Sequence, residues 1–82
     1  MYRSYLTPNG KRVYKVRQML NDSLSYKIVT VPIGEAESMY NSNYSNQKRW
    51  PDFKYSDDAQ YTLDAFAKEE NLTPYQGKGS NA

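Results

Sequence analysis

The chain has 82 residues and a formal net charge of +2, with 11 lysines and arginines against nine aspartates and glutamates. It contains neither cysteine nor histidine, which excludes disulfides, thiolate metal sites and the commonest general base. This length predicts a single domain, and no apolar run approaches the ~18 residues of a membrane span. The first residues also lack the apolar stretch of a secretory signal. We therefore expect a soluble, cytoplasmic protein that is not an enzyme and has no cofactor or metal.

The first twenty residues predict two antiparallel strands. Residues 1–6 could form an edge strand, and the turn after them has the pattern of a three-residue hairpin loop with Gly10 in the left-handed position. Residues 11–20 alternate between a face with Tyr14 and Val16 and a basic face, which is the period of a half-buried strand. Helix formers are frequent here, but the β-branched and aromatic residues favour a strand.

A second turn at residues 21–23 leads to the strongest predicted strand, residues 24–33. Its apolar side chains occupy even positions up to Ile28 and odd positions from Val29 onwards. Such a change of parity indicates either a β-bulge or burial of both faces at that end. Three strands that follow one another in this way form an antiparallel meander.

Residues 34–44 have the apolar spacing of a short helix, and the asparagine- and serine-rich residues 45–54 predict an irregular connection. A helix cannot run through Trp50 because the residue before a proline avoids the α region. We expect Trp50, Phe53 and Tyr55 to fold under the helix that follows.

Residues 56–72 give the clearest signal, that of an amphipathic helix. Ser56 suits the N-cap and is followed by two aspartates in the first turn. Asn71 suits a left-handed stop, after which Leu72 can fold back on the helix. The apolar face comprises Ala59, Leu63, Phe66 and Ala67.

Together these signals predict an α+β fold in which residues 1–72 form one compact domain. A three-stranded antiparallel β-meander packs against the C-terminal α-helix, with a short helix after the sheet. The face of the sheet opposite the long helix is expected to remain in solvent. Residues 73–82, rich in glycine and small polar residues, are expected to form a flexible C-terminal tail.

Charge and tyrosine are distributed unevenly. Residues 1–33 contain six basic residues and one acidic residue, whereas residues 56–82 contain two basic and five acidic residues. The two segments could attract each other, or the asymmetry could mark an interaction surface. There are nine tyrosines, a type enriched in interfaces and able to stack on bases. The expected core or core-edge tyrosines are Tyr14, Tyr26, Tyr40 and Tyr61.

Acidic residues supply the only candidates for catalysis or metal binding. Asp52, Asp57 and Asp58 could gather around a hard cation, but their spacing is not that of a calcium loop. Most acidic residues can instead be explained structurally, because they lie in predicted turns, in the first turn of a helix or on its solvated face. The sequence also lacks a glycine-rich phosphate loop and the Ser-x-x-Lys nucleophile pattern.

Recognition of another protein is the function that the sequence favours. The candidate contact residues are of the types that dominate interface hot spots and lie in and beside the asparagine-rich connection. They are Tyr40, Tyr44, Arg49 and Trp50. Trp50 could equally be a core residue below the helix. A homo-oligomer is possible as well, either over the helix or through an exposed first strand.

Nucleic-acid binding by a basic face of the sheet is the alternative. Basic residues with an aromatic neighbour can contact phosphates and stack on a base. The candidate residues are Arg3, Tyr5, Lys11, Lys15, Arg17 and Lys27.

No motif in the chain matches that of a protein family. In general character the chain is similar to small accessory proteins of phages and mobile elements, which include inhibitors of host enzymes and anti-CRISPR proteins. This likeness implies an inhibitor or accessory factor that binds a protein.

Overall fold

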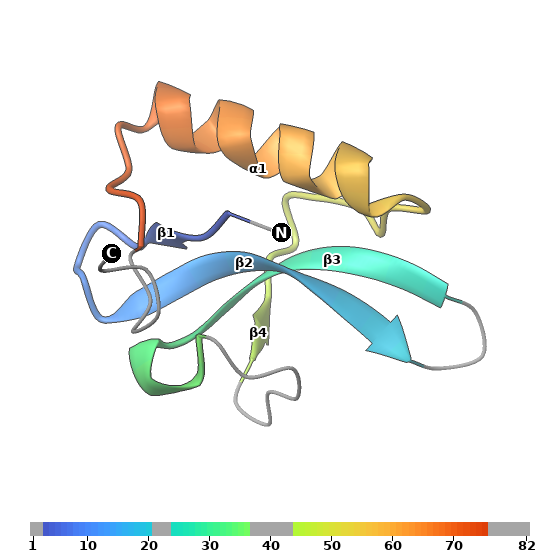
Figure 1. Cartoon of the computed structure of the whole chain (residues 1–82), viewed down its shortest axis with the longest axis horizontal. Helices are drawn as coiled ribbons and strands as arrows, with labels where there is room; N and C mark the ends of the chain where they lie inside the picture. The colour runs from blue at the N-terminus through green and yellow to red at the C-terminus, as the bar shows by residue number, and fades with distance from the viewer. Residues whose placement is uncertain (1–2, 21–23, 37–43, 76–82) are drawn as a thin grey trace, which may run out of the picture.

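The computed structural model describes residues 3–20, 24–36 and 44–75. One α-helix lies across one face of an antiparallel sheet, which confirms the predicted α+β class (Figure 1). The sheet has four strands in the order β1-β2-β3-β4, one more than predicted. In chain order the elements are β1 (Tyr5–Leu6), β2 (Arg12–Leu20), β3 (Leu24–Pro32), a 3-10 helix (Ile33–Glu35), β4 (Ser45–Asn46) and α1 (Ser56–Glu69). No helix within the described ranges is long and apolar enough to cross a membrane.

Strands β2 and β3 form the long central hairpin. Their pairing is continuous from Arg12 opposite Pro32 to Leu20 opposite Leu24, with no bulge. The change of parity at Val29 therefore reflects burial of both faces at one end of the hairpin. This settles the two alternatives that the sequence left open.

The core between α1 and the sheet consists of the predicted apolar helix face and the even-numbered residues of the hairpin. Leu63 is fully buried, and complete burial of such a side chain contributes about 1.5–3 kcal/mol. Tyr14, Val16, Ile28 and Ala59 are buried with Leu63, and the partly buried residues around them include Trp50, Phe53, Phe66 and Leu72. Tyr61 and Tyr55 were expected in this core but are 77% and 60% exposed.

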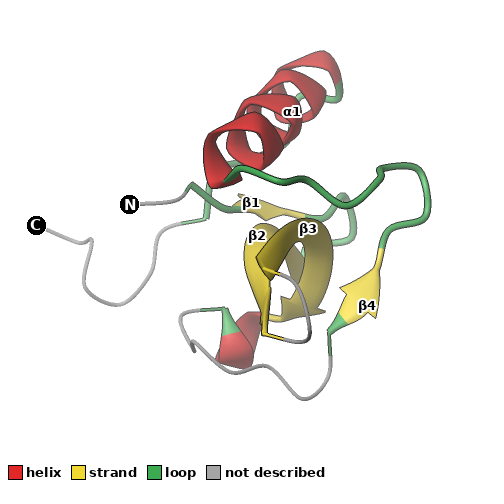
Figure 2. Ribbon diagram, turned by 90° about the vertical axis from the view of Figure 1, so that its right-hand side faces the viewer, coloured by secondary structure: helices red, strands yellow, loops and turns green. Residues whose placement is uncertain are grey.

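A second core lies on the opposite face of the sheet, so the expectation that this face stays in solvent is wrong at one end of the hairpin. Val13, Val29 and Val31 are buried there with Ala36. Leu6, Tyr44 and Tyr75 pack against them. The 3-10 helix lies on the side of the β2–β3 hairpin opposite α1 (Figure 2), and Ala36 directly after it packs against the odd-numbered valines.

The two ends of α1 differ: the C-terminal end follows the prediction, whereas the N-terminal end does not. Tyr55, in an extended conformation, is the N-cap, and no side chain caps the helix there. Ser56 is instead the first helical residue. The C-terminal end is as predicted: Asn71 has a φ of 57°, and the Leu72 N–H donates to the Ala67 carbonyl at 2.9 Å. That bond belongs to a Schellman ending.

Strand β1 is covered on its outer side by residues 73–75. Tyr5 is bridged to Pro74, the Leu6 N–H donates to the Thr73 carbonyl at 2.8 Å, and the Tyr75 N–H donates to the Ser4 carbonyl at 2.9 Å. The packed chain therefore extends to at least Tyr75, past the predicted boundary at residue 72, and β1 is not an exposed edge. Residues 76–82 lie outside the described residues.

Two further predictions need adjustment. The turn before β2 has Gly10 at a φ of 73°, as predicted, but Thr7 pairs with Arg12 and leaves a four-residue loop. Of the predicted helix 34–44, the structure shows only the end of the 3-10 helix Ile33–Glu35 followed by a turn. Residues 37–43 lie outside the described ranges.

Candidate protein-interaction surfaces

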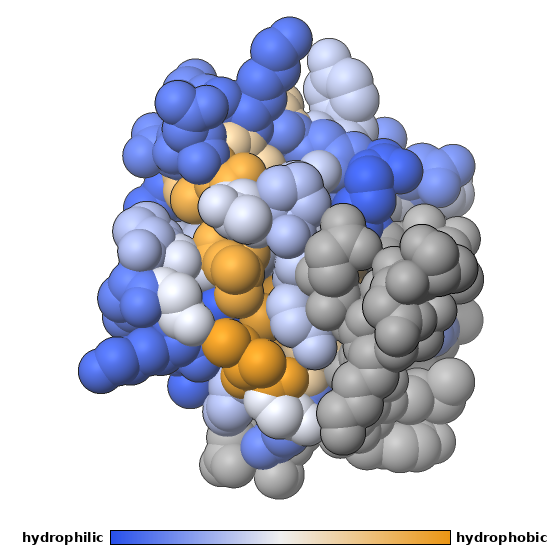
Figure 3. Space-filling model, turned by 60° about the vertical axis from the view of Figure 1, so that its left-hand side comes forward, coloured by the Kyte–Doolittle hydropathy of each residue, from blue (hydrophilic) through white to orange (hydrophobic). Residues whose placement is uncertain are grey.

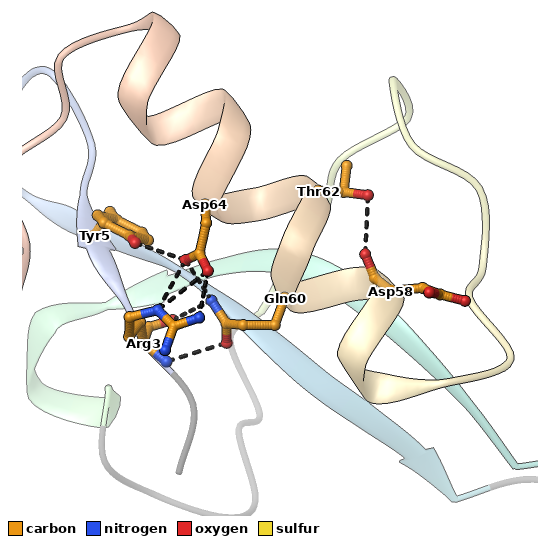
Figure 4. A network of polar contacts seen from close by, with 6 residues as sticks. All are labelled: Arg3, Tyr5, Asp58, Gln60, Thr62 and Asp64. Atoms are coloured by element: carbon orange, nitrogen blue, oxygen red, sulfur yellow. Dashed lines mark hydrogen bonds and ion pairs between the residues drawn. The ribbon is translucent and has the colours of Figure 1, made fainter.

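A network of polar contacts joins Arg3 and Tyr5 to α1 (Figure 4). Asp64 accepts hydrogen bonds from the guanidinium of Arg3, from the hydroxyl of Tyr5 at 2.6 Å and from the amide of Gln60 at 2.9 Å. Gln60 also bonds both main-chain polar groups of Arg3. Because Gln60 is only 6% exposed, this network is a structural anchor on the flank of the helix.

The contacts of this network shift the pKa values of Asp64, Arg3 and Tyr5. The hydrogen bond from Arg3, followed by those from Tyr5 and Gln60, holds the pKa of Asp64 below its ordinary value against the opposing effect of burial. The Asp64 carboxylate in turn raises the pKa of Arg3. Burial, and then the bond to Asp64, raises the pKa of Tyr5. Arg3 and Tyr5, two of the predicted nucleic-acid contacts, are thus engaged with an acidic helix.

Three other predicted nucleic-acid contacts lie on the far face of the sheet. Arg17 stacks on Tyr44, with its guanidinium carbon 4.2 Å from the ring centre. Lys27 lies directly opposite Arg17 in the register and forms an ion pair with Asp52. Lys15 donates to the Ala36 carbonyl at 3.0 Å. Burial, and then the charge of Arg17, lowers the pKa of Lys15.

The predicted basic surface is therefore divided. Lys15, Arg17 and Lys27 share one face, whereas Arg3 and Tyr5 lie on the helix side. The remaining residue of the set, Lys11, is exposed in the turn before β2.

An aromatic cluster lies between α1 and the loop after β4. The Trp50 ring contacts the rings of Phe66 and Tyr14 edge-on, with centroid distances of 5.0 and 6.2 Å. Arg49 covers this cluster from outside: its guanidinium carbon lies 4.7 Å from the Phe66 centroid and 5.3 Å from the Trp50 centroid. We call Arg49, Trp50 and Phe66 the aromatic platform.

The four predicted protein contacts do not form one surface. Arg49 and Trp50 lie together on the platform, with Arg49 exposed and Trp50 half-buried. Tyr44 lies on the opposite face of the sheet under Arg17, and Tyr40 is outside the described residues. Trp50 is thus at the edge of the core and also borders the surface.

Gln60 and Asp64 were missed by the sequence reasoning. Their partners Arg3 and Tyr5 are about sixty positions earlier in the chain, and no local pattern links such distant residues. A signal did exist at Gln60, which follows Ala59 and precedes Leu63 by three positions on the apolar side of the helix. A polar residue on that side requires a partner.

The acidic candidates do not form a metal site in the described part of the chain. Asp52 is paired with Lys27, while Asp57 and Asp58 are exposed in the first turn of α1. No group of three potential ligands is close enough to hold a metal ion among the residues described.

A small hollow beside Lys27, Trp50 and Asp52 has room for about one water molecule.

One face of the molecule carries a narrow apolar band. Figure 3 shows this band descending from the level of α1 on the side of the molecule where β1 lies, bordered by hydrophilic side chains. The partly exposed aliphatic residues near this end of the sheet are Leu6, Ile33 and Leu72.

Comparison with known proteins found no matching family model, no matching curated protein and no matching solved structure.

Proposed function

We propose that this is a non-catalytic binding protein that recognises another protein in the cytoplasm and acts as an inhibitor or accessory factor. The proposed contact surface is the aromatic platform. It combines an arginine and a tryptophan, two of the residue types that dominate the energetics of protein interfaces.

The observation that supports this proposal is the position of Arg49. Its side chain is exposed, yet its guanidinium lies over Phe66 and beside Trp50. An arginine held on aromatic rings loses less conformational freedom when it binds a carboxylate or carbonyl of a partner. The rings beneath are fixed by their edge-on contacts with each other and with Tyr14.

The test is affinity capture from a nuclease-treated host lysate with three matched baits. The unmodified protein and Lys68→Ala, which removes an exposed cation from the last turn of α1, should capture the same protein. Arg49→Ala should lose it. Equal capture by all three baits would show that the platform is not the binding surface.

Nucleic-acid binding is the second candidate, supported by one observation. Arg17 and Lys27 are like charges directly opposite each other across β2 and β3. Asp52 pairs with Lys27, whereas Arg17 takes part in neither ion pair of the described residues, so a phosphate could bind at Arg17. This candidate predicts retention on DNA or RNA that weakens steeply with salt and is reduced by Arg17→Glu. The absence of binding to either polymer at low salt would eliminate it.

A further inference from the structure

Half of strand β2 has an open outer edge. Strand β1 pairs only with Val13 and Tyr14, and the chain before it leaves the sheet at Arg3, which is bound to Gln60 on α1. The Arg12 carbonyl accepts from the Thr7 N–H on the outer side of β2. Because main-chain groups alternate in direction along a strand, the polar groups of even-numbered residues beyond Tyr14 also point outward. These residues are Val16, Gln18 and Leu20.

No main-chain group of residues 3–20, 24–36 or 44–75 pairs with this edge. The Gln18 carbonyl is approached only by the guanidinium of its neighbour Arg17, at 3.5 Å. An unpaired edge of this kind is a template for another extended chain. The open length of β2 is visible in Figure 1, where the strand continues well past β1.

Arg17 lies in the middle of this open stretch and has unused hydrogen-bonding capacity. Its Nε is buried without a hydrogen-bond partner, and its Nη1 donates to the sulfur of Met19, a weak acceptor, at 3.1 Å. Neither ion pair found among the described residues involves Arg17. Tyr44 supports the guanidinium from one side. The group is therefore held in place, and no described residue gives it an anionic partner.

We propose that the open edge of β2 binds an extended segment of a partner protein with an aspartate or glutamate opposite Arg17. The main-chain polar groups of Arg17 point toward Lys27 on β3, not toward the open edge. The acidic residue of an added antiparallel strand would therefore lie opposite Arg17 in a non-hydrogen-bonded pair. In such a pair the Cα atoms are about 4.5 Å apart and the side chains are closest. The neighbouring residues of the segment, on the α1 side, would lie beside Val16 and should be apolar. This rests on the proposed function only in that the partner is a protein, because the surface is separate from the platform.

A second copy of the chain does not satisfy this site by pairing its own β2. The sequence of β2, RVYKVRQML, contains no acidic residue, so no register of β2 against β2 supplies a carboxylate. Antiparallel pairing centred on Gln18 places Arg17 opposite Met19. In-register parallel pairing places the two Arg17 residues at the same level.

The test uses a synthetic peptide, acetyl-Thr-Val-Glu-Val-Thr-amide, its glutamine analogue and an analogue of the glutamate peptide in which the main-chain nitrogens of both valines are methylated, since the valines face Val16 and Gln18 and carry the N–H groups that point toward β2. Binding is followed by NMR of the uniformly labelled full chain, which reports the main-chain amides and the Nε–H of Arg17. The glutamate peptide should shift the amides of Val16, Gln18 and Leu20 together with the Arg17 Nε–H. The glutamine analogue should bind about tenfold more weakly, and N-methylation should abolish binding.

Three variants test whether Arg17 and the open edge of β2 are responsible for peptide binding. Arg17→Gln should remove the preference for glutamate, while Lys11→Gln, which removes an exposed cation at the far end of β2, should retain it. Gln18→Pro deletes an outward N–H without removing a bond to β3 and should block binding, since proline is tolerated on an edge. Thermal unfolding checks that each variant is folded. If Gln18→Pro does not fold, the N-methylated peptide still tests whether binding requires main-chain hydrogen bonds at this edge.

The proposal is overturned if the glutamate peptide produces no shifts at millimolar concentration, if glutamate and glutamine bind equally, or if the shifts lie elsewhere. It is also overturned if only a single-stranded oligonucleotide shifts the Arg17 signal, or if sedimentation shows a dimer that buries this edge. Arg49→Ala should not affect peptide binding. Loss of captured protein with Arg49→Ala and loss of the preference for the glutamate peptide with Arg17→Gln are therefore independent outcomes for the two surfaces.

Discussion

Gln60 binds the main chain of Arg3 through both atoms of its side-chain amide. Its Oε1 accepts from the Arg3 N–H at 3.0 Å, and its Nε2 donates to the Arg3 carbonyl at 3.2 Å. These two bonds satisfy the main-chain N–H and carbonyl of Arg3, as a neighbouring β-strand would. It diverts the chain from β2 to α1 at the point where β1 begins.

Replacing Gln60 should therefore destabilise the protein. Gln60→Ala removes the two bonds to Arg3 and the bond to Asp64 in a side chain that is almost completely buried. We expect the free energy of unfolding to fall by about 1–3 kcal/mol, as measured by urea denaturation. Tyr61→Ala, the next position along the same helix, should change it by less than about 0.5 kcal/mol because that side chain is exposed. Equal effects of the two substitutions would contradict the anchoring role.

Acid should weaken the same anchor through Asp64. Because the folded-state pKa of Asp64 is lowered, chiefly by Arg3, its charged form stabilises the folded protein. This contribution is complete above the ordinary aspartate pKa of about 3.8 and is lost as the pH falls below it through the lowered folded value.

Urea denaturation over a series of acidic pH values checks this sign. Asp64→Asn should lose stability at neutral pH and show a shallower decline in acid than the unmodified protein. An NMR titration of the Asp64 carboxyl carbon with a midpoint at or above the ordinary aspartate value would contradict the prediction.

Gly10 and Gly34 form a matched pair for testing backbone strain. A Cβ at either position would meet no atom within 4 Å, but only Gly10 has a positive φ, of 73°. Gly10→Ala should therefore lower the free energy of unfolding by about 1–2 kcal/mol. Gly34→Ala should leave it unchanged or raise it slightly, because alanine restricts the unfolded chain. Thermal unfolding of both variants measures the difference, and its absence would mean that the turn relaxes freely.

Trp50 and Arg49 should separate stability from binding on the aromatic platform. Trp50→Ala opens a gap between Tyr14 and Phe66 and should cost about 3 kcal/mol. Arg49→Ala removes an exposed side chain and should cost less than about 1 kcal/mol. Trp50 is the only tryptophan, so its fluorescence reports unfolding of the unmodified protein and of Arg49→Ala, while circular dichroism serves for Trp50→Ala. A large loss of stability in Arg49→Ala would make it unsuitable for the capture experiment.

The regular elements could be predicted because their patterns repeat over many residues. The spacing of Leu63 and its neighbours, with Asn71 as a stop, defined α1, and period-two alternation defined β2 and β3. Strand β4 could not be predicted in this way. It has only two polar residues, Ser45 and Asn46, whose pairing depends on the position of β3.

The sequence identified candidate contact residues but not how they are arranged in space, and their role in binding stays a prediction. Arg49 and Trp50 are neighbours in sequence and remain so in space, whereas Tyr44 was grouped with them but lies on the other face of the sheet. The chain crosses the edge of the sheet between Tyr44 and Trp50, through its pairing with β3. A local pattern does not reveal such a crossing, which also explains why the second core was missed.

The location of β1 between β2 and residues 73–75 determines the order in which the fold can be completed. During synthesis, residues 3–6 leave the ribosome well before α1 and the segment that flanks β1. Until both have emerged, Tyr5 lacks its helix partner and the outer bonds of Ser4 and Leu6 remain with water. The β2–β3 hairpin can form early because its contacts are local, but closure of this side of the sheet must wait for the last described residues.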